Sequence, residues 1–285
     1  MMNKIVLVTG ASTGLGVGIA IGAAKIGHKV YATMRDVSKR AVLDAAAQTA
    51  GVNLNVLTLD VQKMETIDAA VNHIIKADRH IDCVVNNAGM GFVRSTEQAS
   101  LEDAERVMDI NFMGVLRVTK AVLPHMREHQ SGHIINISSI GGLVGQPFNE
   151  IYCASKFAVE GYTEALASYV QGSFKIKFTL VEPGGIQSEF ANSAMKHVSE
   201  TGGILQDSYL PILQKYMGGM KERGISAYQT VEQVADVVLQ VMENPEPPLR
   251  IRTSQWAEDF ARIKTGLDAD GTKSRDMVVK TFLGS

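Results

Sequence analysis

Hydrophobic and polar positions follow two distinct patterns along the chain. Short runs of consecutive apolar residues, rich in Val, Ile and Leu, predict strands that are buried on both faces of a sheet. Longer segments with apolar residues every three or four positions predict amphipathic helices. Strands are predicted over residues 5–8, 29–33, 54–59, 82–85, 133–137, 175–181 and 249–252. Helices are predicted over residues 15–26, 38–50, 64–77, 101–129, 152–171, 231–242 and 256–263.

Strands and helices alternate along most of the chain. This order predicts an α/β fold with a doubly wound parallel sheet that carries helices on both faces. The pattern loosens between residues 187 and 228, where two Gly-Gly pairs occur. A long irregular stretch inside a compact domain is usually a lid or a binding loop. We therefore expect one domain over residues 1–285, with a substrate-binding loop at about 187–228.

The composition excludes some classes of function and leaves the predicted fold unchanged. The 28 Lys and Arg nearly balance the 30 Asp and Glu and are scattered, which argues against a nucleic-acid or anionic membrane surface. Cys83 and Cys153 are the only cysteines and form no CxxC motif, so neither a disulfide framework nor a zinc site is indicated. The first apolar run is broken by Thr9-Gly10 too early for a signal peptide or membrane span. We expect a cytoplasmic protein that acts on a small molecule without a metal.

A glycine-rich turn follows the first predicted strand. Its sequence, TGASTGLG over residues 9–16, leads directly into the first predicted helix. Free backbone N–H groups and the positive end of a helix at this place would bind the pyrophosphate of a dinucleotide. The spacing GxxxGxG differs from the common GxGxxG, so a turn that only reverses the chain is the alternative interpretation. The residues expected to contact the dinucleotide are Gly10, Ser12, Thr13, Gly14, Leu15 and Gly16.

The end of the second predicted strand bears on the choice between NAD and NADP. Asp36 lies 20 residues after Gly16, about where an acidic residue binds the ribose hydroxyl in NAD-dependent proteins. The strand tip itself is Met34, which cannot accept that hydrogen bond, and Arg35 beside it can pair with a phosphate. We therefore predict that NADP(H) is preferred over NAD(H), through Arg35. A solvated loop charge is the alternative interpretation of Arg35.

A Tyr and a Lys are four positions apart in the segment YCASK, from Tyr152 to Lys156. On a helix this spacing places both side chains on one face. A nearby ammonium favours the phenolate of a tyrosine, whose ordinary pKa is about 10, and so assists proton transfer near neutral pH. A surface contact is the more common role of such a pair. Ser139 lies thirteen positions earlier, at the carboxyl edge of the predicted sheet, where open α/β folds bind ligands.

Six motifs in order give the chain a resemblance to the short-chain dehydrogenase/reductase family, over about residues 5–188. They are TGASTGLG at Thr9, the Asp60-Val61 pair, NNAG over residues 86–89, Asn111 within MDINFMG, Ser139, and YxxxK at Tyr152. The resemblance implies an NAD(P)-binding Rossmann fold and oxidoreductase activity on alcohols and carbonyls. The cofactor-binding residues that it adds are Asp60, Val61, Asn87, Ala88, Gly89, Tyr152, Lys156, Pro183, Gly184, Ile186 and Ser188.

The resemblance also implies roles for four catalytic residues. Ser139 would hold the substrate oxygen, while Tyr152 would donate a proton in reduction and accept one in oxidation. Lys156 would tune Tyr152 and bind the nicotinamide ribose, and Asn111 would organise a water chain to Lys156. For the NNAG segment, contact with the cofactor and support of the sheet centre remain open.

Within the family, the segments YATMRD and SSIGGLVGQPFNEIYCASK are similar to those of hydroxysteroid and retinol dehydrogenases. The similarity implies a bulky apolar carbonyl or alcohol as substrate, and a homodimer or homotetramer formed through the helices at 101–129 and 152–171. Whether Met195, Met217 and Met220 line the substrate pocket or fill gaps in the core remains open. The residues expected in the pocket are Ser139, Leu143, Val144, Phe148 and Asn149.

Two other classes of function compete with an NADP(H)-dependent carbonyl reductase. A catalytically silent NADP-binding regulator or scaffold would have lost catalytic residues, yet Ser139, Tyr152, Lys156 and Asn111 are all present. An isomerase or dehydratase of nucleotide sugars would need a larger substrate domain than residues 187–228 provide. We therefore favour the interconversion of a carbonyl and its alcohol by hydride transfer.

Overall fold

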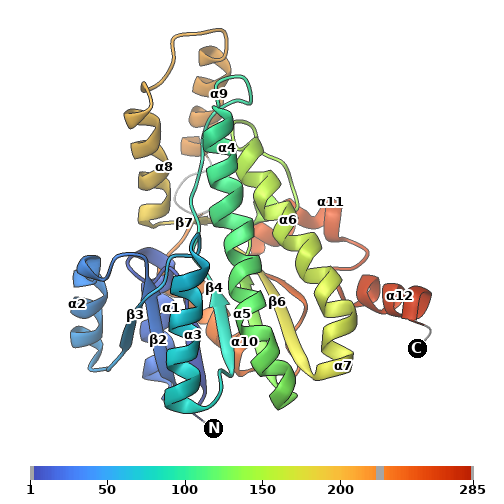
Figure 1. Ribbon diagram of the computed structural model, residues 1–285. Helices are drawn as coiled ribbons and strands as arrows, with labels where there is room; N and C mark the ends of the chain where they lie inside the picture. The colour runs from blue at the N-terminus through green and yellow to red at the C-terminus, as the bar shows by residue number, and fades with distance from the viewer. Residues whose placement is uncertain (1–2, 223–227, 284–285) are drawn as a thin grey trace.

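The computed structural model describes residues 3–222 and 228–283, and its centre is a seven-stranded parallel sheet (Figure 1). The strand order is β3-β2-β1-β4-β5-β6-β9. This sheet, with helices on both faces, confirms the predicted fold. Every predicted strand end lies within one residue of the observed one. The strands are β1 (Ile5–Val8), β2 (Lys29–Met34), β3 (Asn55–Thr58), β4 (Cys83–Asn86), β5 (Gly132–Ile137), β6 (Ile176–Glu182) and β9 (Arg250–Arg252).

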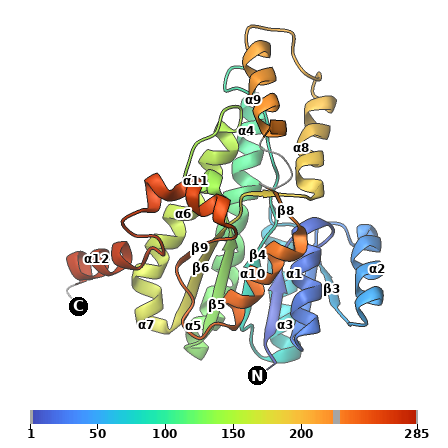
Figure 2. The same cartoon turned by 180° about the vertical axis from the view of Figure 1, so that it is seen from behind.

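Helices cover the two faces of the sheet in separate layers. The helices α1, α2 and α10 pack on one face, which Figure 2 shows, and α3, α5 and α6 pack on the other, which Figure 1 shows. The main helices are α1 (Gly14–Lys25), α2 (Ala41–Ala50), α3 (Met64–Asp78), α4 (Leu101–Met108), α5 (Gly114–His129), α6 (Glu150–Leu166), α7 (Gly172–Phe174), α8 (Glu189–Glu200), α9 (Leu210–Glu222), α10 (Val231–Glu243), α11 (Gln255–Thr265) and α12 (Thr272–Leu283).

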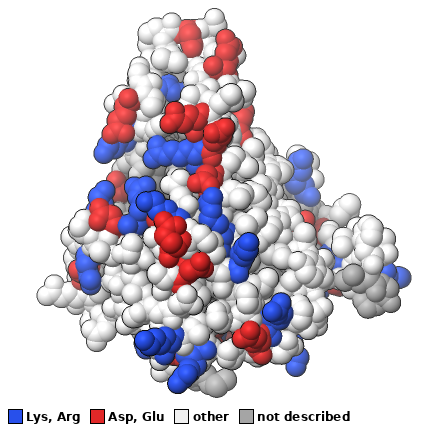
Figure 3. All heavy atoms as spheres, in the orientation of Figure 1, with Lys and Arg blue, Asp and Glu red and all other residues white. Residues whose placement is uncertain are grey.

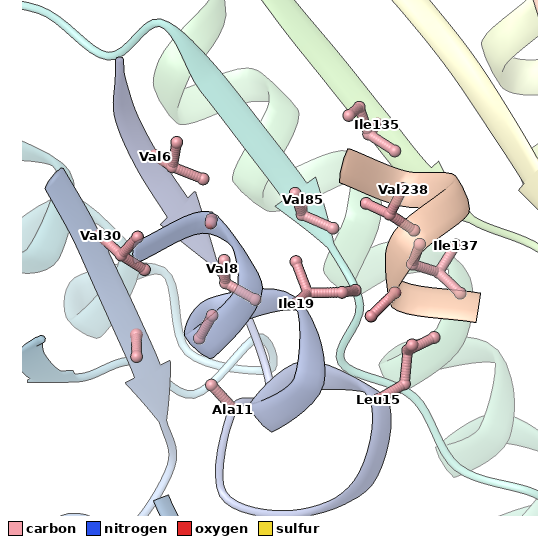
Figure 4. Packing of buried hydrophobic residues seen from close by; sticks show 14 of the residues in the cluster. Val6, Val8, Ala11, Leu15, Ile19, Val30, Val85, Ile135, Ile137 and Val238 are labelled. Atoms are coloured by element: carbon pink, nitrogen blue, oxygen red, sulfur yellow. The ribbon is translucent and has the colours of Figure 1, made fainter. Parts of the chain in front are cut away.

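Alternate side chains of each strand reach the two helical layers. Val6 and Val8 of β1 belong to the buried cluster that includes Ile19 of α1 and Val238 of α10 (Figure 4). Leu7, between them, belongs to the cluster on the other face, with residues of α3 and α5. Because both faces are covered, neither set of positions is polar. This burial accounts for the uninterrupted apolar runs in the sequence.

The long helix predicted over residues 101–129 is continuous but changes its geometry in the middle. A π-helical stretch, η2 (Asp109–Met113), joins α4 to α5. It contains Asn111, whose side chain binds the backbone of Met90. Single π-helical turns of this kind are frequent at functional sites. A second π-helical stretch, η4 (Ala167–Gln171), follows α6.

The prediction of an irregular loop at about 187–228 was wrong in its secondary structure. Two helices, α8 and α9, occupy most of it and rise beyond the carboxyl ends of the strands (Figure 1). Among the described side chains of α8, only Ala194 and Val198 are buried, so its buried stripe is narrow. Gly202 and Gly203, which suggested a flexible chain, adopt positive φ after α8 ends. Residues 223–227 lie outside the described part of the chain.

Two short strands connect this segment to the sheet region. β7 (Gly185–Ile186) pairs with β8 (Tyr228–Gln229) in a separate two-stranded sheet.

On the surface, Lys and Arg are interspersed with Asp and Glu on the face shown in Figure 3. Among residues 3–222 and 228–283, no helix has the length and apolar character that crossing a membrane requires.

Candidate active site

A cleft of about 1100 Å³ lies at the carboxyl ends of the strands. It opens beside β1 and β4, where the winding of the sheet reverses and where open α/β folds bind ligands. The residues predicted from sequence that line this cleft are Gly10, Ser12, Thr13, Gly14, Leu15, Arg35, Asp60, Val61, Asn87, Ala88, Gly89, Ser139, Asn149, Tyr152, Lys156, Pro183, Gly184, Ile186 and Ser188.

The glycine-rich turn between β1 and α1 is shaped for a ligand that carries phosphate groups. Thr13 is the N-cap of α1 but makes no capping hydrogen bond through its side chain, and the first turn of the helix has no acidic residue. Backbone N–H groups at this helix start are therefore available to an anion in the cleft. Gly16 does not line the cleft; a Cβ there would lie 2.3 Å from the carbonyl oxygen of Gly10. Its part is to let the helix approach the turn closely.

The NNAG segment both supports the sheet and lines the cleft. The hydroxyl of Thr9 accepts hydrogen bonds from the backbone N–H groups of Asn87 and Ala88, both at 3.0 Å. The side-chain amide of Asn87 donates to the carbonyls of Thr9 at 2.9 Å and Gly10 at 3.1 Å. These bonds tie the glycine-rich turn to the end of β4. The two interpretations of NNAG that the sequence leaves open are therefore compatible.

The residues after β2 divide between the cleft and the solvent. Met34 is buried, and Arg35 is exposed; both line the cleft. Asp36 does not line it, and its carboxylate accepts hydrogen bonds from the backbone N–H and the hydroxyl of Ser38. Lys39 also lines the cleft, and its Nζ lies 4.0 Å from the carboxylate of Asp36. Sequence reasoning missed Lys39 because a lysine in a turn carries no signal of its own.

Three of the four predicted catalytic residues come from two neighbouring elements. Tyr152 and Lys156 lie in the first two turns of α6, and Ser139 follows β5. The Ser139 hydroxyl accepts a hydrogen bond from the backbone N–H of Gly141 at 3.0 Å and is hydrogen-bonded to Tyr152. The ammonium of Lys156 donates to the carbonyl of Ile137 at 2.9 Å and lies 5.9 Å from the centre of the Tyr152 ring. The three side chains therefore meet in one cleft.

Burial dominates the ionisation of this group. It raises the pKa of Tyr152 to about 12, with the hydrogen bond from Ser139 acting in the opposite direction. Burial also lowers the pKa of Lys156 to about 8, against the attraction of Glu160. The sequence predicts that Lys156 lowers the pKa of the phenol. In the protein alone the net shift of the Tyr152 pKa has the opposite sign, because loss of water around the phenolate outweighs the hydrogen bond from Ser139.

Asn111 stands behind the catalytic residues without lining the cleft. Its side chain accepts from the N–H of Met90 at 2.8 Å and donates to the carbonyl of Met90 at 2.9 Å and the hydroxyl of Ser155 at 3.0 Å. A Cβ at Gly89 would lie 3.3 Å from the Asn111 oxygen and 3.8 Å from the Lys156 nitrogen. Gly89 therefore lies between these two side chains. Its lack of a side chain keeps them close.

The structure brings only part of the predicted substrate pocket to the cleft. Asn149 lines it, whereas Leu143, Val144 and Phe148 do not. Leu143 and Phe148 are buried, and the Phe148 ring packs 5.9 Å from that of Tyr216. A tight 3₁₀ turn after Ser139, η3 (Ile140–Gly142), precedes Leu143, which is buried.

Aromatic residues that the sequence did not single out line the cleft instead. Phe190 of α8 stands edge to face with Tyr152, with ring centres 5.8 Å apart. Trp256 and Phe260 of α11 stack at 5.2 Å, and Trp256 packs over Gly184. Their four-residue spacing on a predicted helix places both rings on one face, so the sequence could have indicated this aromatic pair. The aromatic residues that line the cleft are Tyr152, Phe190, Tyr216, Tyr228, Trp256 and Phe260.

Two of the three methionines left open by the sequence, Met195 and Met217, have described side chains. Met195 is exposed, and neither Met195 nor Met217 lines the cleft. Met220 lies outside the residues whose side chains are described. Cys83 and Cys153 are both buried free thiols.

Comparisons with known proteins show which family the chain resembles. A family model described as short chain dehydrogenase matches residues 4–199. The chain is 39% identical to retinol dehydrogenase 8 of Bos taurus over 94% of its length and 87% of that protein. It is 34% identical to 17-beta-hydroxysteroid dehydrogenase type 1 of Mus musculus, over 93% of this chain and 78% of the relative.

A solved structure shows the same likeness over the whole chain. A short-chain dehydrogenase from Streptomyces avermitilis superposes with a TM-score of 0.75 at 28% identity, covering 100% of this chain and 99% of the other. The family model, the curated relatives and the solved structure thus all indicate the same family. The chain belongs to the short-chain dehydrogenase family.

Proposed function

We propose that the protein is an NADP(H)-dependent oxidoreductase that interconverts a bulky apolar ketone or aldehyde and its alcohol. The observation that carries this proposal is the convergence of Ser139, Tyr152 and Lys156 in the cleft that the uncapped start of α1 also faces. One cavity thus offers a place for a dinucleotide and groups for proton transfer to an oxygen. We also propose a single domain over residues 1–285, with residues 187–228 forming the substrate side of the cleft.

The preference for NADP(H) is supported by the charges after β2. Arg35 lines the cleft and has no carboxylate partner among the described residues, so it is available for a phosphate on the adenosine ribose. Lys39 lines the same region and adds a second positive charge. Asp36, the residue that would favour NAD, is the N-cap of the following 3₁₀ turn, and its side chain accepts a hydrogen bond from the backbone N–H of Ser38. A phosphate on the adenosine ribose would therefore lie near the positive charges of Arg35 and Lys39.

The residues of the chain account for the chemistry at the substrate oxygen. The bound cofactor supplies or accepts the hydride at the substrate carbon. Ser139 and Tyr152 offer hydroxyl groups to the substrate oxygen, and Tyr152 donates the proton in reduction. Lys156 places a positive charge next to Tyr152, which favours the phenolate that is left after proton transfer. Asn111 holds the backbone of Met90 beside the site and so maintains its shape.

An apolar substrate is supported by the aromatic lining of the cleft. Phe190 and Tyr216 come from α8 and α9, while Trp256 and Phe260 come from α11. Retinol dehydrogenase 8 and 17-beta-hydroxysteroid dehydrogenase are similar to this chain over more than nine tenths of its length, and their names indicate apolar alcohols. We extend this substrate class to the present protein.

A homodimer or homotetramer is part of the proposal. Apolar side chains are exposed along α6 and the π-helical stretch η4 that continues it, where Phe157 and Tyr169 are each more than 40% exposed. Exposed apolar residues along one helix are typical of surfaces that meet a second copy. Sedimentation of the purified protein would test this part independently of its activity.

The main test is a panel of apolar ketones, aldehydes and steroids incubated with NADPH or NADH, with loss of reduced nicotinamide as the readout. We expect turnover with at least one bulky apolar carbonyl, and faster turnover with NADPH at limiting cofactor. Tyr152→Phe is the matched inactive control. NADPH binding without any turnover across the panel would favour the silent regulator instead.

A further inference from the structure

Arg94 is a buried cation that the proposed chemistry does not use. It lies between β4 and α4 and is 7% exposed. Its guanidinium donates to the carbonyls of Gly203 at 2.8 Å, Val198 at 3.2 Å and Thr201 at 3.0 Å, and to the Thr201 hydroxyl at 3.0 Å. No carboxylate among the described residues forms an ion pair with it. Its charge is therefore satisfied by one end of α8.

This arrangement suits the physical properties of a helix terminus. The last carbonyls of a helix lack partners within the helix, and the terminus carries a partial negative charge. A guanidinium at that place makes charge-assisted hydrogen bonds and interacts favourably with the helix dipole. Because burying a charge without such partners is costly, Arg94 and the end of α8 stabilise each other's position.

The other end of α8 reaches the catalytic residues. Ser188 is the N-cap of α8 and lines the cleft, and Phe190 in the first turn packs against Tyr152. Between the two ends the helix packs closely on the chain that carries Arg94. A Cβ at Gly91 would lie 2.9 Å from the Phe190 ring and 3.1 Å from the Cβ of Ala194. A shift of α8 would therefore move Phe190 relative to Tyr152.

We propose that Arg94 is a positioning residue that locks the C-terminal end of α8 and so fixes the wall of the substrate cleft. Through α8 it sets the position of Phe190 over Tyr152. The catalytic part of this inference rests on the proposed function, in which Tyr152 transfers the proton. The structural part concerns the order of α8 alone and does not depend on any substrate.

The test compares Arg94→Met and Arg94→Lys with the wild type. Met keeps much of the side-chain length but none of the donors, and Lys keeps the charge with fewer bonds. Arg127→Met is the matched control, because Arg127 is exposed near the end of α5 and does not line the cleft. Amide hydrogen exchange over residues 194–201, with β4 as the internal reference, reports on the lock without a substrate.

In Arg94→Met we expect exchange over residues 194–201 to accelerate by about tenfold or more, since several charge-assisted bonds are lost. We expect β4 to be unchanged, Arg94→Lys to be intermediate, and Arg127→Met to match the wild type. KM for the carbonyl substrate should rise by about tenfold in Arg94→Met, with NADPH affinity within about twofold and partial recovery in Arg94→Lys.

Wild-type exchange over residues 194–201 in Arg94→Met would overturn the proposal, as would equal acceleration in β4. Faster exchange in α8 with unchanged KM would overturn the catalytic part. If Arg94→Met does not fold, Arg94→Lys provides the test. Wild-type exchange over residues 194–201 and a wild-type KM in Arg94→Lys would then refute the proposal. A wild-type enzyme that turns over no carbonyl would remove the proposed function but leave the exchange result to judge the lock.

Discussion

At the scale of single residues, burial in the cleft reverses the direction in which the pKa of Tyr152 was expected to shift. Tyr152 and Lys156 lie together as their spacing predicts. Burial favours the neutral form of each side chain: it raises the pKa of Tyr152 to about 12 and lowers the pKa of Lys156 to about 8. A positive charge close to the phenol in the loaded enzyme would oppose this effect on Tyr152. At pH 7 Tyr152 is therefore a neutral phenol, whereas Lys156, whose pKa is still above 7, keeps most of its positive charge.

Arg35 gives the prediction on cofactor choice. Replacing it in Arg35→Ala should weaken NADPH binding by about 1.5 to 3 kcal/mol, the range for a hydrogen bond to a charged group, and should hardly change NADH binding. Fluorescence titration of both cofactors measures the two affinities. Lys39→Ala is the matched comparison, because Lys39 lines the same region. If Arg35→Ala bound NADPH as well as the wild type, the phosphate contact would have to be assigned elsewhere.

At the scale of elements, α8 and α9 differ in how firmly they are attached. α8 has a buried stripe and the bonds from Arg94, whereas no residue of α9 with a described side chain is fully buried. The contacts of α9 with the rest of the chain include Tyr216, whose hydroxyl accepts from the Asn149 amide at 3.0 Å. Both residues line the cleft. We therefore expect α9 to move more readily than α8 when the cleft is filled.

We predict that α9 exchanges its amide hydrogens faster than α8 in the protein alone. Few buried contacts hold it, and low contact density is typical of segments that open locally. NADPH together with an apolar carbonyl should slow exchange in α9, because substrate in the cleft would contact Tyr216. Mass-spectrometric exchange resolves the two helices. Protection of α9 equal to that of β4 without ligand would mean that it is a fixed part of the fold.

At the scale of the whole molecule, the strands and the meeting of Ser139, Tyr152 and Lys156 in one cleft were predictable from sequence, whereas the aromatic lining of that cleft was not. Strands such as Ile5–Val8 are buried on both faces, so their composition alone marks them. Phe190 packs against Tyr152, and Arg94 binds the end of α8; both contacts join residues that are distant in sequence. A local sequence pattern therefore could not predict either contact. Leu143 illustrates the limit: it follows a tight turn after Ser139 and is buried.

The sheet also sets the response of the fold to acid. His133 in β5 is buried, and burial lowers its pKa to about 3, from an unfolded value near 6.5. The folded state therefore binds fewer protons than the unfolded chain between these values, and stability is lost as pH falls below about 6.5. His133→Gln should reduce the loss of unfolding free energy between pH 7 and pH 4 by about 3 kcal/mol. Urea unfolding at both pH values measures it; identical losses in the two proteins would refute this assignment.

The central claim is that Tyr152 transfers the proton in a cleft that binds the cofactor independently. The most direct measurement is turnover of Tyr152→Phe alongside its NADPH affinity. The substitution removes only the phenolic oxygen, so NADPH should bind within about twofold of the wild type. Turnover should fall by more than about a thousandfold, because proton donation and activation of the carbonyl are both lost. A variant that binds NADPH normally and keeps a tenth or more of the wild-type turnover would contradict the account.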